Sequence, residues 1–117
     1  MSTETQSTLP EAFGMVVRFT LKEGHGEAFD ELMRRTVAEI QRHEPGTLAY
    51  VVQHVEGEPN TRIFYELYAS DEAFQFHQDA AHIHEFKEQR EQHLERVEVD
   101  RLSVVTHAGL VGGNDGQ

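Results

Sequence analysis

The sequence predicts an α+β domain in which helices cover one face of a four-stranded antiparallel sheet. Two segments with helical periodicity alternate with four segments rich in β-branched and aromatic residues, in the order strand, helix, strand, strand, helix, strand. This order is that of the ferredoxin-like arrangement. A chain of 117 residues with 38% hydrophobic residues can form a modest core. We therefore expect one domain over residues 11–108, between flexible tails at 1–10 and 109–117.

A change of sequence period separates the first two elements. Residues 13–21 are rich in Val and Phe and precede a turn at residues 22–26, which predicts a strand. From residue 27 the apolar side chains follow the three-and-four spacing of a helix that buries one stripe, and they are Phe29, Leu32, Met33, Val37 and Ile40. Pro45 and Gly46 end this helix.

The next two strands read as an antiparallel hairpin. Residues 47–55 alternate in the manner of a strand, residues 57–60 supply a turn, and the third strand follows and ends at Tyr68. In this third strand Phe64, Glu66 and Tyr68 share one face, while the other face is also apolar. A strand that is apolar on both faces belongs inside a domain, and its exposed side needs a cover, for which a homodimer is the simplest source.

The C-terminal third predicts a second helical region and a last strand. Ser70 is suited to be an N-cap, and Asp71 and Glu72 are acids that favour the positive end of a helix. We expect helix from Asp71 to about Val97, with a break within residues 79–82 as an alternative. The charged run at 87–92 has the composition of a solvated helix end, and residues 97–105 predict the last strand.

Composition excludes several function classes. The chain has 21 acidic and 10 basic residues and a net charge of −11, which disfavours nucleic acid and anionic membranes as partners. It has no cysteine, so disulfides, thiolate metal sites and cysteine nucleophiles are absent. No apolar run reaches membrane-spanning length, and the N-terminus lacks the pattern of a signal peptide. We expect a cytoplasmic protein.

Eight histidines raise the question of a metal site, but their spacing does not favour one. His77 and His84 are seven residues apart, which is about 10 Å along a helix and too far to share an ion. The pairs with helical ligand spacing, HxxxH and HExxH, do not occur. We expect no metal site, and we expect most histidines to lie at the surface.

His77 is the histidine with the strongest case for a function. It lies near the predicted end of the aromatic strand, one helical turn after Phe74. It is either a core histidine bonded to backbone or a proton acceptor or ligand contact. Glu66 is either a buried partner of a histidine or arginine or a solvated residue at an edge. The position of His82 depends on the helix break.

Aromatic residues surround these polar candidates. Tyr50, Phe64, Tyr68 and Phe74 can pack in the core, line a ligand site, or do both.

The segment that joins the third strand to the second helix resembles a known family. Its residues Tyr65, Glu66, Tyr68, Ser70, Ala73, Phe74, His77 and His82 resemble the pattern Y-E-x-W-x-S, A-F-x-x-H-x-x-x-x-H of antibiotic biosynthesis monooxygenases. The stretches 22–24 and 44–46, and Tyr50 in the second strand, support the resemblance, which covers about residues 13–107.

The resemblance implies a homodimer that forms a dimeric α+β barrel and oxidises a small or polycyclic hydroquinone-like aromatic with dioxygen. No cofactor is implied, because a deprotonated phenol can itself reduce dioxygen. His77 and Tyr68 are then the catalytic candidates, as base and hydrogen-bond donor. The substrate-binding candidates are Phe64, Glu66, Phe74, Tyr50 and His82.

The sequence departs from the family at three positions and leaves other functions open. The resemblance implies that family members that oxidise polyketides have Asn, Trp and Tyr where this chain has Phe64, Tyr68 and Phe74. A non-catalytic barrel that binds a small apolar metabolite is one alternative, and a non-oxidative isomerase on the same fold is another. Haem degradation is disfavoured, because the chain has no tryptophan and its first strand has no asparagine.

Overall fold

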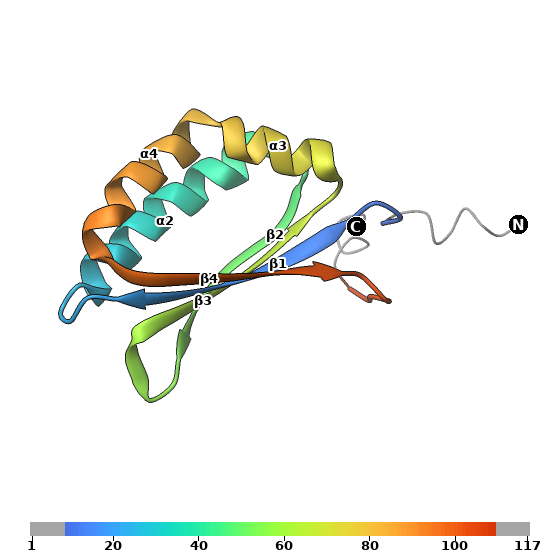
Figure 1. Ribbon diagram of the computed structural model, residues 1–117. Coiled ribbons are helices and arrows are strands. Elements are labelled where there is room, and N and C mark those ends of the chain that lie inside the picture. The colour runs from blue at the N-terminus through green and yellow to red at the C-terminus, as the bar shows by residue number, and fades with distance from the viewer. Residues whose placement is uncertain (1–8, 110–117) are drawn as a thin grey trace, which may run out of the picture.

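The sheet has the strand order β2-β3-β1-β4, and every neighbouring pair is antiparallel. The computed structural model describes residues 9–109, so the predicted tails at 1–10 and 109–117 lie almost wholly outside the described residues. The strands are β1 (Phe13–Leu21), β2 (Thr47–Val55), β3 (Glu58–Tyr68) and β4 (Leu94–Ser103). Helices α2 (Gly26–His43), α3 (Asp71–Asp79) and α4 (Ala81–Arg90) lie on one face of the sheet (Figure 1). The predicted ferredoxin-like α+β fold is confirmed.

The core lies between this sheet face and the helices. Val17 of β1 stands opposite Phe64 of β3, so their side chains point to the same face. The buried cluster is Val17, Phe19, Leu21, Phe29, Leu32, Met33, Phe64 and Phe86. Three of its members on α2 belong to the stripe that the sequence predicts, because residues three and four apart share one helix face.

The predicted alternative of a helix break is confirmed at Ala80. This residue has φ −69° and ψ 141°, an extended conformation that separates α3 from α4. At the other end of α3, the Ser70 hydroxyl accepts a 3.1 Å hydrogen bond from the backbone N–H of Ala73, as expected of an N-cap. A Cβ at Gly46 would lie 2.6 Å from Cβ of Ala73. The glycine therefore lets α3 pack directly on the loop after α2.

The prediction of helix to about Val97 is wrong. Helix α4 ends at Arg90, a short 3-10 helix η1 occupies Glu91–His93, and β4 begins at Leu94. Pairing with β1 explains the difference: Leu94 stands opposite Leu21, and the backbone N–H of Lys22 donates to the carbonyl of His93 at 2.8 Å. These sheet contacts override the helical preference of the charged residues before Val97.

The hairpin turn is shorter than the sequence predicts. Val55 pairs with Glu58, so β3 begins two residues before the expected end of the turn. Gly57 has φ +84°, which a glycine adopts without a steric penalty. Its conformation closes the hairpin through Glu56 and Gly57 alone.

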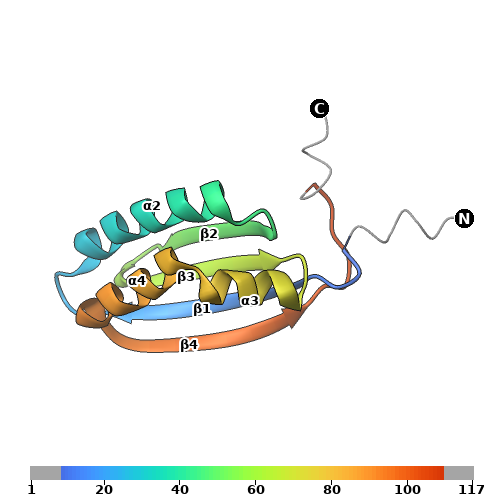
Figure 2. The same cartoon turned by 90° about the horizontal axis from the view of Figure 1, so that it is seen from above.

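Strand β4 forms an edge of the sheet that is covered by no helix of residues 9–109. Figure 2 shows α3 and α4 end to end above the middle of the sheet, with β4 outside them. Val97 and Val99 face the helix side but are 36% and 52% exposed. The helix layer is therefore open along β4. Within residues 9–109, no helix combines the length and the apolar character that crossing a membrane requires.

Candidate functional site

A cavity of about 170 Å³ lies between the sheet and helices α3 and α4. Apolar side chains from four elements form most of its wall, and they are Met15, Val17, Phe19, Phe74, Ile83, Phe86, Val97 and Val99. The polar lining residues are Tyr50, Glu66, His77, Gln78, Lys87 and Arg90. Because Val99 is half exposed, the cavity opens past β4. An apolar chamber with a few inward polar groups is the usual form of a small-molecule site. We call it the interior cavity.

His77 contacts a buried carboxylate. Its Nδ1 lies 2.7 Å from Oε1 of Glu44, the residue that follows α2, and the side chain of Glu44 is only 1% exposed. Burial alone would raise the pKa of Glu44, but hydrogen bonds from His77, Thr47 and His82 hold this pKa below its usual value. Glu44 is therefore ionised at neutral pH. An ionised carboxylate only accepts, so Nδ1 of His77 donates and the neutral ring keeps its lone pair on Nε2.

Glu66 and Tyr68 form a buried pair on β3. The Tyr68 hydroxyl donates to Oε1 of Glu66 at 2.5 Å, and the residues are 0% and 6% exposed respectively. Burial raises the pKa of Glu66, and the hydrogen bond from Tyr68 offsets only part of that increase. Burial and the neighbouring Glu66 also raise the pKa values of Tyr68 and Tyr50. Both phenols consequently stay protonated and serve as donors.

Arg90, at the end of α4, brings a cation to the interior cavity. Its guanidinium carbon lies 5.5 Å from the ring centre of Phe19 and 5.2 Å from that of Phe86. Its Nε is buried and has no hydrogen-bond partner among residues 9–109. Burial lowers the pKa of Arg90, but an arginine remains charged at any physiological pH. A buried donor of this kind has unused capacity for an oxygen atom or an anion.

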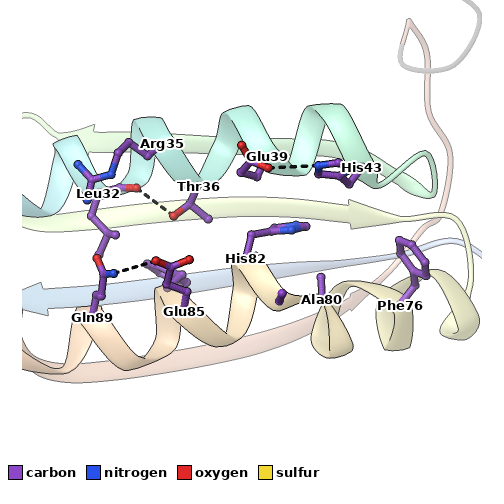
Figure 3. Close-up of a pocket in the computed structure, with 12 residues that line it drawn as sticks. Leu32, Arg35, Thr36, Glu39, His43, Phe76, Ala80, His82, Glu85 and Gln89 are labelled. Atoms are coloured by element: carbon purple, nitrogen blue, oxygen red, sulfur yellow. Dashed lines mark hydrogen bonds and ion pairs between the residues drawn. The ribbon is translucent and has the colours of Figure 1, made fainter.

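His82 lies in a second pocket, between α2 and the α3–α4 pair. This outer pocket has a volume of about 620 Å³ (Figure 3). Its lining includes Glu39 and His43 of α2, and the ring of His43 stacks on that of His82 with 5.9 Å between centres. Figure 3 shows His82 projecting from the start of α4 toward α2. Its Nε2 contacts Oε2 of Glu44 at 2.5 Å.

The residues that the sequence singles out therefore lie in three places: the interior cavity, the core behind its wall, and the outer pocket. Four of them line the interior cavity: Tyr50, Glu66, Phe74 and His77. Phe64 and Tyr68 are fully buried and support that wall from inside. The ring of Phe64 is 5.8 Å from Tyr50, and the ring of Tyr68 is 5.1 Å from His77. His82 shares Glu44 with His77 but lines the outer pocket.

Two residues of the site are not among the sequence-based candidates. Glu44 enters the sequence analysis only through the stretch 44–46 that supports the resemblance, although an acid at the negative end of a helix is unfavourable without a compensating partner. Arg90 belongs to a run interpreted as a solvated helix end, and for Arg90 this interpretation is wrong. Its spacing from Ile83 and Phe86, seven and four residues, places it on their buried helix face. That spacing is the signal that could have identified it.

Within residues 9–109, no group of three or more His, Asp or Glu side chains is arranged to hold a metal ion. His93 departs from the expectation of surface histidines, because it is 8% exposed and its Nδ1 lies 3.0 Å from Nδ1 of His25. Burial lowers the pKa of His93, which favours a neutral ring that can share one proton with its neighbour.

Comparison with known proteins gives one family. The model of the family described as "Antibiotic biosynthesis monooxygenase" matches residues 12–89, about two thirds of the chain. This range contains every sequence-based candidate and Glu44, and it ends immediately before Arg90. A search of curated proteins gave no match.

Several solved structures share the fold over nearly their whole length. A protein of Pseudomonas aeruginosa is 26% identical, with a TM-score of 0.76 over 84% of this chain and 98% of its own. Two proteins named for the antibiotic biosynthesis monooxygenase family come from Caulobacter crescentus and Nitrosomonas europaea. The first is 18% identical, with a TM-score of 0.79 over 88% of this chain and 98% of its own. The second is 20% identical, with a TM-score of 0.77 over 85% of this chain and 95% of its own. At these two identities the likeness concerns the fold alone.

Proposed function

Because this chain belongs to the antibiotic biosynthesis monooxygenase family, we propose that it is a cofactor-independent monooxygenase that oxidises a small hydroquinone-like aromatic with dioxygen. The observation that carries the proposal is the 2.7 Å contact between His77 Nδ1 and Glu44, which orients a base in the apolar interior cavity. A carboxylate that fixes the tautomer of a histidine also stabilises the imidazolium that forms when the ring takes a proton.

The size of the interior cavity favours a substrate with one ring. Its volume of about 170 Å³ is small beside the roughly 300–1,000 Å³ of sites for drug-sized ligands. An apolar cavity of about 150 Å³ can hold benzene. A polycyclic substrate would need space beyond the open side at β4, so we rank a single-ring phenol above the polycyclic alternative.

The proposed reaction begins with proton transfer from the phenol to Nε2 of His77. Arg90 and the Tyr50 hydroxyl are cavity donors that can stabilise the resulting phenolate oxygen. The phenolate transfers one electron to dioxygen, and the radical pair combines at a ring carbon that bears hydrogen. His77 returns its proton to the peroxide, and loss of water leaves a quinone. One phenol and one dioxygen thus give one quinone and one water.

Two copies of the chain form the proposed assembly. The sheet face away from the helices carries Val16, Val51, Ile63, Tyr65 and Leu102, as the strand registers indicate. Val51 and Leu102 are 44% and 36% exposed. Burial of such a face against a second sheet is favourable by about 25 cal/mol per Å² of apolar surface. This apolar sheet face supports a homodimer in which each helix layer points outward.

The test is oxygen uptake by the purified, metal-stripped protein with single-ring hydroquinones and, for comparison, anthrones. His77→Gln is the informative variant, because an amide can keep a hydrogen bond to Glu44 but cannot take the proton. The exposed His84→Gln, on α4, is the matched control. We expect uptake with the wild type and the control, incorporation of one labelled oxygen atom into product, and none of this in His77→Gln. Equal uptake in His77→Gln would remove the base from the mechanism.

A non-oxidative isomerase is the second candidate, and the Glu66 carboxyl favours it. Burial raises the pKa of Glu66, so this group can act as a proton donor in the same cavity as the base His77. An acid and a base in one apolar site suit proton transfer between two carbons or oxygens of a substrate. A folded protein that takes up no oxygen but exchanges substrate hydrogen with solvent deuterium would support this candidate.

A further inference from the structure

Glu44 contacts two histidines through its two carboxylate oxygens. Oε1 accepts from Thr47 at 2.6 Å and lies 2.7 Å from Nδ1 of His77, while Oε2 lies 2.5 Å from Nε2 of His82. The carboxylate side chain is 1% exposed, so water does not screen its charge. One buried negative charge therefore serves two imidazole rings that each can carry a positive charge.

The two histidines belong to different environments. His77, 6% exposed at its side chain, lines the interior cavity, whereas His82, 13% exposed, lines the outer pocket. Glu44 thus contacts one histidine of the interior cavity and one histidine of the outer pocket, which is open to solvent.

The other charged groups near His77 differ from those near His82. Glu66 of β3 is the other acid near His77, with the phenols of Tyr68 and Tyr50 beside it.

Around His82, α2 supplies Glu39, His43 and Arg35, while α4 supplies Glu85. Glu39 already accepts a hydrogen bond from Arg42 and contacts His43 at 3.2 Å. Glu44 is therefore the acid that His77 and His82 have in common.

We propose that His82 is a positioning residue for His77, and that its protonation in the outer pocket weakens the base in the interior cavity; the catalytic part of this inference rests on the proposed function. When His82 is neutral, the Glu44 charge is available to stabilise the His77 imidazolium. When His82 is protonated, its imidazolium already pairs with the Glu44 carboxylate, so a second imidazolium at His77 is less favourable. Groups that interact in this way release their protons as a pair and not independently.

The proposal gives opposite signs for two substitutions. His82→Gln keeps a donor to Glu44 but never carries a charge, so His77 is stabilised in its protonated form up to higher pH. Loss of activity on acidification should then begin at a pH about one unit higher than in the wild type. Glu44→Gln removes the charge, so the same loss should begin at lower pH. A merely structural role of either residue would not move the two profiles in opposite directions.

Titration followed by NMR provides a readout without catalysis. The ring carbon signals of His77 and His82 in the wild type are expected to show two-step curves with shared inflections. His82→Gln should reduce the His77 curve to a single step, and the exposed His84→Gln should leave both curves unchanged. The wild-type curves alone test the coupling if a variant does not fold. Independent single-step curves in the wild type would overturn the inference.

The two readouts separate failure of this inference from failure of the proposed function. Coupled curves together with no oxygen uptake from any substrate would keep the histidine pair and remove the oxidation. Oxygen uptake whose pH profile is the same in His82→Gln and wild type would keep the oxidation and overturn the role of His82. Coupled curves with profiles that move in opposite directions are the expected result.

Discussion

The Tyr68 hydroxyl donates to Oε1 of Glu66 at 2.5 Å, and the two residues are neighbours on the same face of one strand. Two residues apart on a strand, their side chains point the same way, and both are buried under the helices. The single proton of the phenol is therefore committed to Glu66. Removal of the Tyr68 hydroxyl should therefore lower the stability of the folded protein.

We predict that Tyr68→Phe lowers the free energy of unfolding by about 1–3 kcal/mol, because a buried carboxyl loses its donor while the ring packing remains. Urea denaturation at pH 7 measures this change. Tyr65→Phe, on the opposite face of β3, is the control and should have a smaller effect. An unchanged urea midpoint for Tyr68→Phe would show that the hydrogen bond does not contribute to stability.

Glu66 should make the protein less stable as pH rises. Its pKa is raised in the folded protein, so the folded state binds the proton more tightly than the unfolded state. The stability that this group contributes is present below the unfolded value of 4.5 and is lost as pH rises through the folded pKa. Glu66→Gln keeps the shape of the side chain and removes this pH-dependent contribution to stability. The difference in unfolding free energy between Glu66→Gln and wild type should therefore shift in favour of the variant above pH 4.5, and parallel stability profiles would contradict the raised pKa.

The sequence predicts most of the fold because its signals are local. The stripe from Phe29 to Ile40, the Ser70 N-cap and the alternation in β2 each identify an element from nearby residues alone. The start of β4 at Leu94 depends on pairing with Leu21, which lies far away in the chain. A local pattern contains no information on that pairing, so it predicts a helix that is too long.

The site shows the same limit more strongly. Aromatic and histidine residues in one segment pointed to His77 and Glu66, and both line the interior cavity. The partner of His77 is Glu44, 33 residues earlier, and nothing near Glu44 in the sequence indicates that two histidines will meet it. Only the packing of α3 on the loop after α2 brings them together.

Arg90 should matter for activity more than for stability. Arg90→Met removes a half-buried guanidinium whose buried Nε has no partner within residues 9–109, and it leaves an apolar side chain near Phe19 and Phe86. We expect a decrease in kcat of about 100-fold, as for loss of one donor to a developing anion, with the free energy of unfolding unchanged or increased. Steady-state oxygen uptake and urea denaturation measure the two quantities. Full activity in Arg90→Met would exclude a role in phenolate stabilisation.

The proposed dimer makes a prediction for the outer sheet face. Val51→Asp places a charge among apolar side chains that a partner sheet would cover, so it should convert dimer into monomer. Light scattering coupled to size-exclusion chromatography measures the mass. Glu88→Lys changes a charge on the exposed side of α4 and should leave the mass unchanged. A wild-type protein that elutes as a monomer at micromolar concentration would remove the homodimer from the proposed assembly.

Gly46 should control the position of His77 through α3. In Gly46→Ala the new Cβ would lie 2.6 Å from Cβ of Ala73, closer than two carbons can approach, so α3 must move away from the loop that holds Glu44. We expect a loss of about 1–3 kcal/mol in the free energy of unfolding, as for overpacking, and a weaker contact between His77 and Glu44. Ala73→Gly in the same chain removes the opposing carbon and should restore part of both. If the double variant is no better than Gly46→Ala by urea denaturation and by the His77 ring signals, the close approach of these two residues is not what sets the position of α3.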